Sequence, residues 1–245
     1  MGSLVSSLIS DPLQWHLSLS ISDRDIDLHI RRIDGDDSVI SRQIQLNSDT
    51  LSALEDAVYD NPLLLSDFGQ TDVLIDTERY MLIPTEAAET NDICSLLIDK
   101  FWPGDPLTSI MYDIKDTPYT LIAAIDHKLH TFIRRTFTIS SVIHRICPFI
   151  DFCVSDSKGF DGAKMYVDIH GVNTDIAFVR KENLLKANTF ATSAITDILY
   201  YMMLMASTLK FDSATDEISI SGDEQARNEL IPMLRKYFGS SNIKS

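Results

Sequence analysis

The strongest restriction on how this chain can fold is a repeated order of expected elements. Three strands, a helix and a fourth strand occur in the first half and again about 150 residues later. In the first copy, alternating apolar residues predict strands over Trp15–Ile21, 26–30 and 39–46, and a helix over 51–58 precedes a strand at 72–75. A second strand follows at Tyr80–Pro84. The repeat indicates two halves of one topology.

The second copy is the clearer one. Short alternating segments at 164–169, 174–180 and 184–190 predict an antiparallel meander, because the connections are too short for crossovers. A helix over 195–209 and a strand over 217–221 come next, and a last helix runs towards Phe238. The order β-β-β-α-β-α in each half predicts an α/β fold with mixed sheets, built from two RNase H-like halves.

Short polar side chains mark where the helices should begin, because their oxygens accept N–H groups left unpaired in a first helical turn. The expected caps are Asn47, Ser48 or Asp49, then Asp126, then Thr192 or Ser193, and finally Asp223. Pro232 lies inside the last expected helix and predicts a kink or a break there, because proline removes a hydrogen bond and crowds the preceding turn.

The middle of the chain, residues 85–155, is predicted to be an inserted α/β region. It contains an expected helix over 91–101, strands at 110–114 and 119–125, a helix from Asp126 to about Arg135, and a helix over 142–153 interrupted at Pro148. A polar stretch at 155–159 has the composition of a linker. We therefore expect a first half over 11–158, which includes the insert, and a second half over 159–245.

Charge and composition exclude several classes of protein. Thirty-six acidic against 21 basic residues give a net charge of −15, which argues against a nucleic-acid binder or an anionic-membrane binder. The longest apolar uncharged run, 198–209, is too short to span a bilayer as a helix, so we expect no direct membrane insertion. The chain has three cysteines, an odd number: Cys94, Cys147 and Cys153. Together with a first segment that lacks the character of a signal peptide, they predict a cytoplasmic protein with reduced thiols.

Two groups of residues in the sequence are of types that bind metal ions. His127 and His130 lie one helical turn apart and have the spacing to share a metal ion, but no third ligand is evident, so ordinary surface or partly buried histidines are the simpler interpretation. The acidic residues of an RNase H-like nuclease would be Asp23, Asp25, Asp27 and Asp168. The negative net charge argues against that nuclease.

Four segments carry a resemblance to a known superfamily: YVDIHGVNT at 166–174, LLKAN at 184–188, DILYY at 197–201 and ISISG at 218–222. Together with the doubled element order, they resemble the actin-like ATPase superfamily, which includes actin, sugar kinases and pilus or secretion proteins of the PilM type. YMLIP before Thr85, and ANTF followed by ILYY, are similar to an uncharacterised bacterial family with this fold.

The resemblance implies a nucleotide site made by two hairpins. In active members, backbone N–H groups of each hairpin hold phosphates, and aspartates hold a hydrated magnesium ion. The residues that match the second hairpin and the adenosine strand are Asp168, Gly171, Asn173, Thr174, Gly222 and Asp223. The second hairpin departs from the pattern by one extra residue, and only one of the usual two glycines follows the adenosine strand.

The first hairpin departs further from the superfamily pattern. Residues 18–25 contain no glycine, Ser18 stands where an aspartate would align, and the polar positions left are Ser22 and Arg24. Side chains in such a turn obstruct close approach of backbone to phosphate. We therefore expect a degenerate nucleotide site and a non-catalytic scaffold that binds a protein partner, without a cofactor. The alternative is a protein that binds ATP with magnesium and hydrolyses it weakly.

Overall fold

The computed structural model describes residues 9, 11–34, 39–46, 49–89, 93–104, 106–137, 140–239 and 243–244. The chain divides into two compact units: unit 1 comprises Met1–Asp113 and Pro118–Cys147, and unit 2 comprises Ile114–Thr117 and Pro148–Ser245. The expected caps Asn47 and Ser48 lie outside the described residues. The half boundaries expected from the sequence stay a prediction.

Unit 1 contains a five-stranded mixed sheet. Its order is β3-β2-β1-β4-β8, with β1 and β4 parallel, β4 and β8 parallel, and β2 antiparallel to both β1 and β3. The strands span Trp15–Ile21 (β1), Asp25–Arg32 (β2), Val39–Gln45 (β3), Gln70–Ile75 (β4) and Ser140–His144 (β8). Leu17, Leu19 and Ile21 alternate along β1 and are buried, as the period of two predicts.

Two helices of unit 1 begin at the aspartates expected from the sequence. Helix α1 (Thr50–Asp60) starts where Asp49 Oδ1 accepts the N–H of Ser52 at 3.1 Å. Helix α4 (His127–Thr136) starts where Asp126 Oδ1 accepts the N–H of Leu129 at 2.9 Å. Both cap predictions are confirmed, because a carboxylate at these positions satisfies an otherwise unpaired donor.

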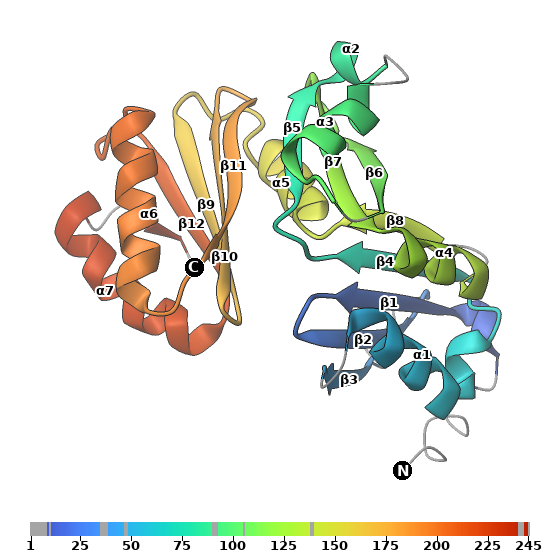
Figure 1. The fold of residues 1–245 in the computed structure, drawn as a ribbon. Coiled ribbons are helices and arrows are strands. Elements are labelled where there is room, and N and C mark those ends of the chain that lie inside the picture. Colours follow the sequence, from blue (N-terminus) through green and yellow to red (C-terminus); the bar gives the residue numbers. More distant parts are fainter. Residues whose placement is uncertain are drawn as a thin grey trace. The chain divides into compact units, whose positions relative to one another are not determined.

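The insert between β4 and β8 forms its own antiparallel sheet in the order β5-β7-β6. Its strands are Tyr80–Pro84 (β5), Leu107–Asp113 (β6) and Tyr119–Asp126 (β7), and its helices are Thr85–Ala88 (α2) and Ile93–Phe101 (α3). Figure 1 shows α3 beside this sheet, and Cys94 and Ile98 of α3 share a buried cluster with Ile122 and Ala124 of β7.

Unit 2 has a sheet of the same topology. Its order is β11-β10-β9-β12-β13, with β10 antiparallel to β9 and β11, and β12 parallel to β9 and β13. The strands span Ala163–His170 (β9), Asn173–Arg180 (β10), Asn183–Ala191 (β11), Glu217–Gly222 (β12) and Ile243–Lys244 (β13). Each unit therefore orders its main sheet as third, second, first, fourth and fifth strand. Internal duplication as the origin of this likeness stays a prediction.

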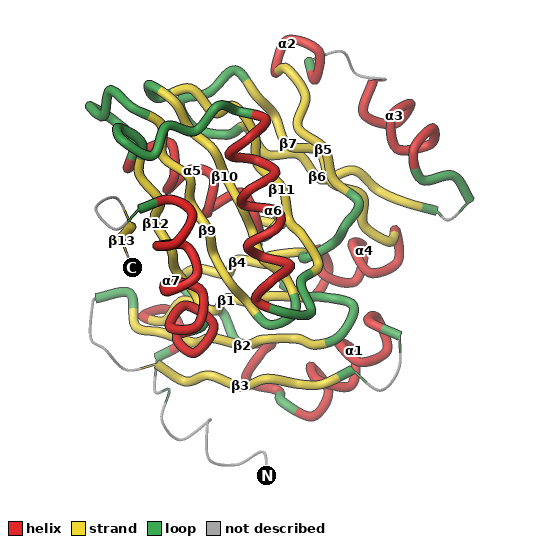
Figure 2. The backbone as a smooth tube through the Cα atoms, turned by 90° about the vertical axis from the view of Figure 1, so that its left-hand side faces the viewer, coloured by secondary structure: helices red, strands yellow, loops and turns green. Residues whose placement is uncertain are grey.

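One face of the unit 2 sheet carries the core. Helices α6 (Ile195–Thr208) and α7 (Glu224–Phe238) lie on the same side of the sheet in Figure 1, and Figure 2 shows α6 running along the strands. Met165, Val167 and Ile169 of β9 pack in one buried cluster with Met202 of α6 and Leu230 of α7. Odd-numbered residues of β9 thus face this core, so its even-numbered residues face the opposite side.

Three helix predictions need correction. The segment expected as one helix over 142–153 is wrong at its start, because 140–144 form β8 and α5 spans Ile146–Asp156. Pro148 does not interrupt α5, since it lies in the first turn, where proline needs no intrahelical partner. Helix α7 continues through Pro232 to Phe238, so the expected break is absent. Buried Leu230 and Leu234 on either side of Pro232 hold α7 against the core.

The expected cap of α6 is also wrong. Its cap residue is Ala194, and the N–H groups of Ser193 and Ala194 donate to Asp197 Oδ2 at 2.9 and 3.0 Å. Thr192 instead forms a buried hydroxyl pair with Thr174 at 2.9 Å.

No helix in the described part of the chain is long and apolar enough to cross a membrane.

Two glycines of unit 2 provide a matched test of the fold. Gly222 has φ +92°, and a Cβ there would lie 2.0 Å from the carbonyl oxygen of Ile169, whereas Gly171 has φ +57° and open space around it. We expect Gly222→Ala to destabilise the protein by about 3 kcal/mol or more, and Gly171→Ala by about 1 kcal/mol, because only the first adds a backbone clash to the strain of positive φ. Urea unfolding midpoints measure this difference, and equal losses would contradict the packing of β12 on β9.

Candidate functional site

The hairpin of β9 and β10 brings three metal-ligand side chains together. Its two-residue turn, Gly171 and Val172, pairs Asp168 directly with Asp175 across the two strands. Asp168, His170 and Asp175 therefore lie on the face opposite the α6 and α7 core. One ligand atom from each residue lies within 4.8 Å of the other two. Among the described residues this is the one such cluster of three.

Asp175 is the buried member of the cluster, with no exposed surface. Its Oδ1 accepts a hydrogen bond from the Thr189 hydroxyl at 2.6 Å, and its Oδ2 lies 3.3 Å from His170 Nε2. Thr189 stands opposite Asp175 in the β10–β11 ladder, so sheet register fixes this contact. A buried carboxylate needs such partners, because desolvation of an unpaired charge is costly.

Asp168 is held from the other side of β9. Ser221 of β12 pairs with Asp168 in the parallel ladder, and its hydroxyl donates to Asp168 Oδ1 at 2.7 Å. Burial first, and then the carboxylates of Asp156, Asp168 and Asp175, raise the pKa of the Cys153 thiol well above its ordinary value. A cation is therefore favoured next to this face.

The other residues expected from the second hairpin divide between the two faces of the sheet. Gly171 takes the first position of the turn with positive φ, as a tight turn requires. Asn173 stands opposite His170. Thr174 is buried on the core face, where its hydroxyl pairs with Thr192. Hence the Thr174 hydroxyl does not join the carboxylate of Asp168.

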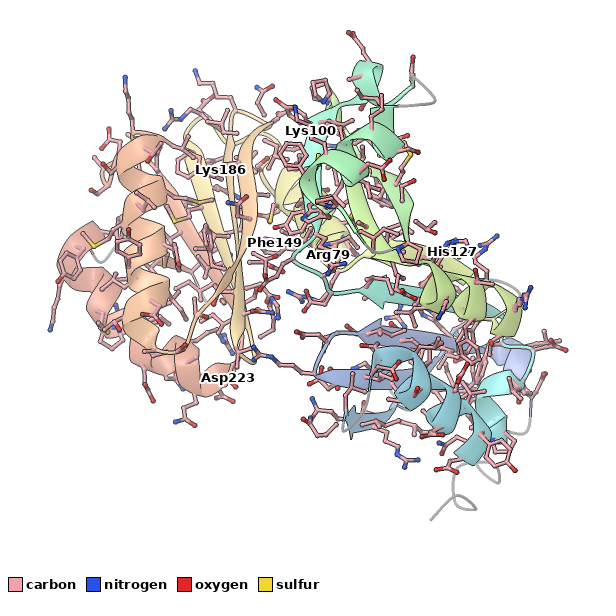
Figure 3. The ribbon with its side chains drawn as sticks, in the orientation of Figure 1. Arg79, Lys100, His127, Phe149, Lys186 and Asp223 are labelled. Carbon is pink, nitrogen blue, oxygen red and sulfur yellow. The ribbon has the colours of Figure 1, made fainter. Side chains whose placement is uncertain are left out.

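Gly222 and Asp223 link β12 to α7. The Asp223 N–H donates to the Ile169 carbonyl at 2.8 Å, and its Oδ1 accepts the N–H of Ala226 at 2.7 Å. Asp223 lies where α7 begins (Figure 3), so its predicted role as a helix cap is confirmed. The Asp223 carboxylate is thereby used to cap the first turn of α7.

The first hairpin closes on itself. The hydroxyl oxygen of Ser22 accepts the N–H groups of Arg24 at 3.1 Å and of Asp25 at 2.9 Å. The same hydroxyl lies 2.6 Å from Asp25 Oδ1, to which it donates, and the Ser22 N–H donates to the Asp25 carbonyl at 3.0 Å. Two amides of this turn are therefore bonded within the turn. The Arg24 side chain is 60% exposed.

The registers also locate the position of unit 1 that corresponds to Asp168. In unit 1, four residues separate Ile21 from Ile26, the last pair of the β1–β2 ladder. In unit 2, four residues likewise separate the paired residues Ile169 and Thr174, so the two pairs can be aligned. By this count Ser20 corresponds to Asp168. Ser18, which the sequence alignment suggested, lies two residues earlier in β1.

The other candidate groups belong to unit 1. His127 lies at the start of α4 (Figure 3), where its Nδ1 bonds the Thr108 hydroxyl at 2.8 Å. Burial, then Arg134 and His127, lower the pKa of His130. Asp25 belongs to the turn of Ser22, and burial followed by the charge of Asp25 raises the pKa of Asp27.

Away from the hairpin, the same sheet face carries a second polar group. Asp156 of α5 accepts hydrogen bonds from Lys164 Nζ at 2.9 Å and from the Tyr166 hydroxyl at 2.8 Å. The Lys164 bond, and then that of Tyr166, hold the pKa of Asp156 below its ordinary value. Burial, then Asp156, raise the pKa of Tyr166. This group ties α5 to β9.

Comparison with solved structures defines the class of the protein. The chain has the actin-like ATPase fold: it is similar to a Bacteroides thetaiotaomicron protein with actin-like ATPase fold and unknown function, with a TM-score of 0.80 and 20% identity, over 99% of this chain and 93% of the other. It is also similar to a chain of the PilM-PilN type IV pilus biogenesis complex, with a TM-score of 0.58 and 11% identity, over 94% of this chain and 87% of the other.

The family follows from the sequence itself. Residues 9–240 match the model of the family described as "Protein of unknown function (DUF3822)", and the chain belongs to this family. No curated protein sequence matches the chain.

The Asp156 group predicts how stability depends on pH. Because the folded pKa of Asp156 lies below the unfolded one, its contribution is complete above the unfolded value of about 3.8 and is lost as the pH falls through the folded value. We expect Lys164→Met to lower the urea midpoint at pH 7 and to flatten its dependence between pH 5 and the acid range. The control is Lys186→Met, which removes a lysine from an exposed position of β11. Parallel pH profiles for wild type and Lys164→Met would contradict this role.

Proposed function

We propose that this chain is a non-catalytic actin-like scaffold that binds a protein partner and does not hydrolyse ATP. The observation that carries the proposal is the closed turn of unit 1, where the Ser22 hydroxyl holds the N–H groups of Arg24 and Asp25. A phosphate cradle needs backbone donors that point outward and are free to bond an anion. In this turn, a phosphate would have to displace Ser22 before it could use either amide.

Charge supports the same proposal. A triphosphate brings several negative charges, and the chain already has a net charge of −15. Beside the second hairpin, the carboxylates of Asp168 and Asp175 face the same side of the sheet. An anion at this face meets repulsion unless a cation comes with it.

A protein partner is proposed from the fold. PilM in the PilM-PilN type IV pilus biogenesis complex is a solved example of a similar fold in a protein assembly. For this chain we propose a cytoplasmic role in which the partner is a protein and not a nucleic acid, because a strongly acidic chain repels phosphate backbones. No resident cofactor is part of this proposal.

ATP binding with magnesium is the second candidate function. The observation that favours it is that unit 2 keeps Asp168 beside a glycine turn at Gly171, and keeps Gly222 packed on the β9 backbone with φ +92°. These residues, with Asn173, Thr174 and Asp223, are the candidate nucleotide contacts. The candidate requires that the closed turn of Ser22 opens or is not used.

Calorimetric titration with Mg-ATP separates the two functions. We expect no saturable heat up to millimolar nucleotide and no phosphate release above buffer, for the wild type and for Asp168→Ala alike. Ser22→Gly is the informative variant, because it frees the two amides, and a gain of binding in that variant alone would assign the block to Ser22. Micromolar binding with turnover in the wild type, abolished by Asp168→Ala, would contradict the scaffold proposal.

The partner is tested on the full chain isolated from its own cells. The proposal predicts a complex in which a second polypeptide is present at fixed stoichiometry and is retained in Mg-ATP. A chain that is recovered only by itself, at 27.6 kDa by light scattering, would count against a scaffold role.

A further inference from the structure

We propose that Asp168, His170 and Asp175 form a binding site for a first-row transition-metal dication, such as Zn²⁺ or Mn²⁺, which needs no nucleotide. The site goes beyond the scaffold proposal and does not rest on it. It uses Asp175 and His170, which the superfamily resemblance did not single out, and it lies entirely within one hairpin of unit 2.

The geometry of the hairpin fits a shared ion. His170 Nε2 lies 3.3 Å from Asp175 Oδ2, and all three ligand atoms lie within 4.8 Å of one another. Neighbouring ligand atoms of a tetrahedral ion are about 3.3–3.6 Å apart when each bond is about 2.0–2.2 Å long. The His170–Asp175 separation already matches this value, and Asp168 places its ligand atom within 4.8 Å of both, so an ion would have to draw this third ligand closer.

Hydroxyl groups outside the cluster orient both carboxylates. Thr189 donates to Oδ1 of Asp175, and Ser221 donates to Oδ1 of Asp168. Each bond comes from a different neighbouring strand, β11 or β12, so the sheet itself fixes the two carboxylates. Metal sites are commonly built this way, with hydrogen bonds from surrounding residues that fix ligand orientation and raise affinity.

The charge balance also favours a cation. Asp168 and Asp175 are directly opposite each other in an antiparallel pair, an arrangement that destabilises a sheet when both residues carry the same charge. Asp175 has no exposed surface, so water screens its charge little. A dication between the two carboxylates converts this repulsion into attraction.

The ligand types select the metal. An imidazole with two carboxylates suits Zn²⁺, Mn²⁺ and their neighbours, whereas Mg²⁺ prefers oxygen ligands and retains its water. His170 is 23% exposed, so an ion can reach the site from solvent. The competing account is a plain ion pair between a protonated His170 and Asp175, with no metal.

Titration with Co²⁺ and Zn²⁺ decides between these accounts. The full chain, stripped with a chelator, is expected to bind one Co²⁺ with visible d–d absorption, and Zn²⁺ is expected to displace it. Thr189→Val should lower the affinity about 10-fold, and His170→Ala should lower it by about 100-fold or more, because they remove an orienting bond and a ligand respectively. Affinity should also fall in acid, since the imidazole must be neutral to bind.

The matched control is His127→Ala, which removes a histidine from unit 1 and should leave Co²⁺ binding unchanged. Asp175→Asn and Asp168→Asn each alter one carboxylate ligand. Asp168→Asn is the safer of the two variants, because Asp168 is only partly buried and its substitution is less disruptive to folding. Absence of a Co²⁺ spectrum in the wild type, or a spectrum that survives both His170→Ala and Asp168→Asn, would overturn the metal site. Neither result bears on the Mg-ATP titration.

Discussion

The pairing of β9 with β10 is the constraint on which the chemistry of unit 2 depends. A two-residue turn at Gly171 and Val172 leaves one possible register, and that register sets Asp168 against Asp175 on the face away from the core. A shift of one strand by one residue would move its carboxylate to the face of the apolar cluster under α6, where no partner for a buried charge is available from the apolar side chains of that cluster. The apolar residues of β9 that pack in the core thus also determine which residues of β9 lie on the polar face.

The corresponding hairpin of unit 1 has the same place in the same topology and a different chemistry. Its loop has four residues between Ile21 and Ile26, and the Ser22 hydroxyl closes this loop by accepting the N–H groups of Arg24 and Asp25. By register, Ser20 and Asp27 occupy the positions of Asp168 and Asp175, so one carboxylate of the pair is replaced by a hydroxyl. The two hairpins therefore differ in chemistry: the turn of unit 1 is closed by its own hydrogen bonds, and the hairpin of unit 2 carries the three side chains that we propose bind a cation.

Much of this could be predicted from the sequence, and the failures have physical reasons. Alternation located β1 and β9 because one face of each sheet is buried. The sequence does not predict β8 as a strand, because a short apolar run does not distinguish a buried strand from a helix. The start of α6 was missed because Asp197 supplies the capping oxygen from inside the helix. The meeting of Asp168 with Asp175 could have been derived by counting outward from the Gly171 turn.

The amides of Arg24 and Asp25 donate to the Ser22 hydroxyl, and we propose that they do not bind a nucleotide. Backbone amide resonances in a titration with a magnesium complex of a non-hydrolysable ATP analogue test it most directly. We expect these two resonances to keep their chemical shifts up to millimolar analogue in the wild type. Saturable shifts of both, concurrent with shifts of Gly171 and Gly222, would contradict it.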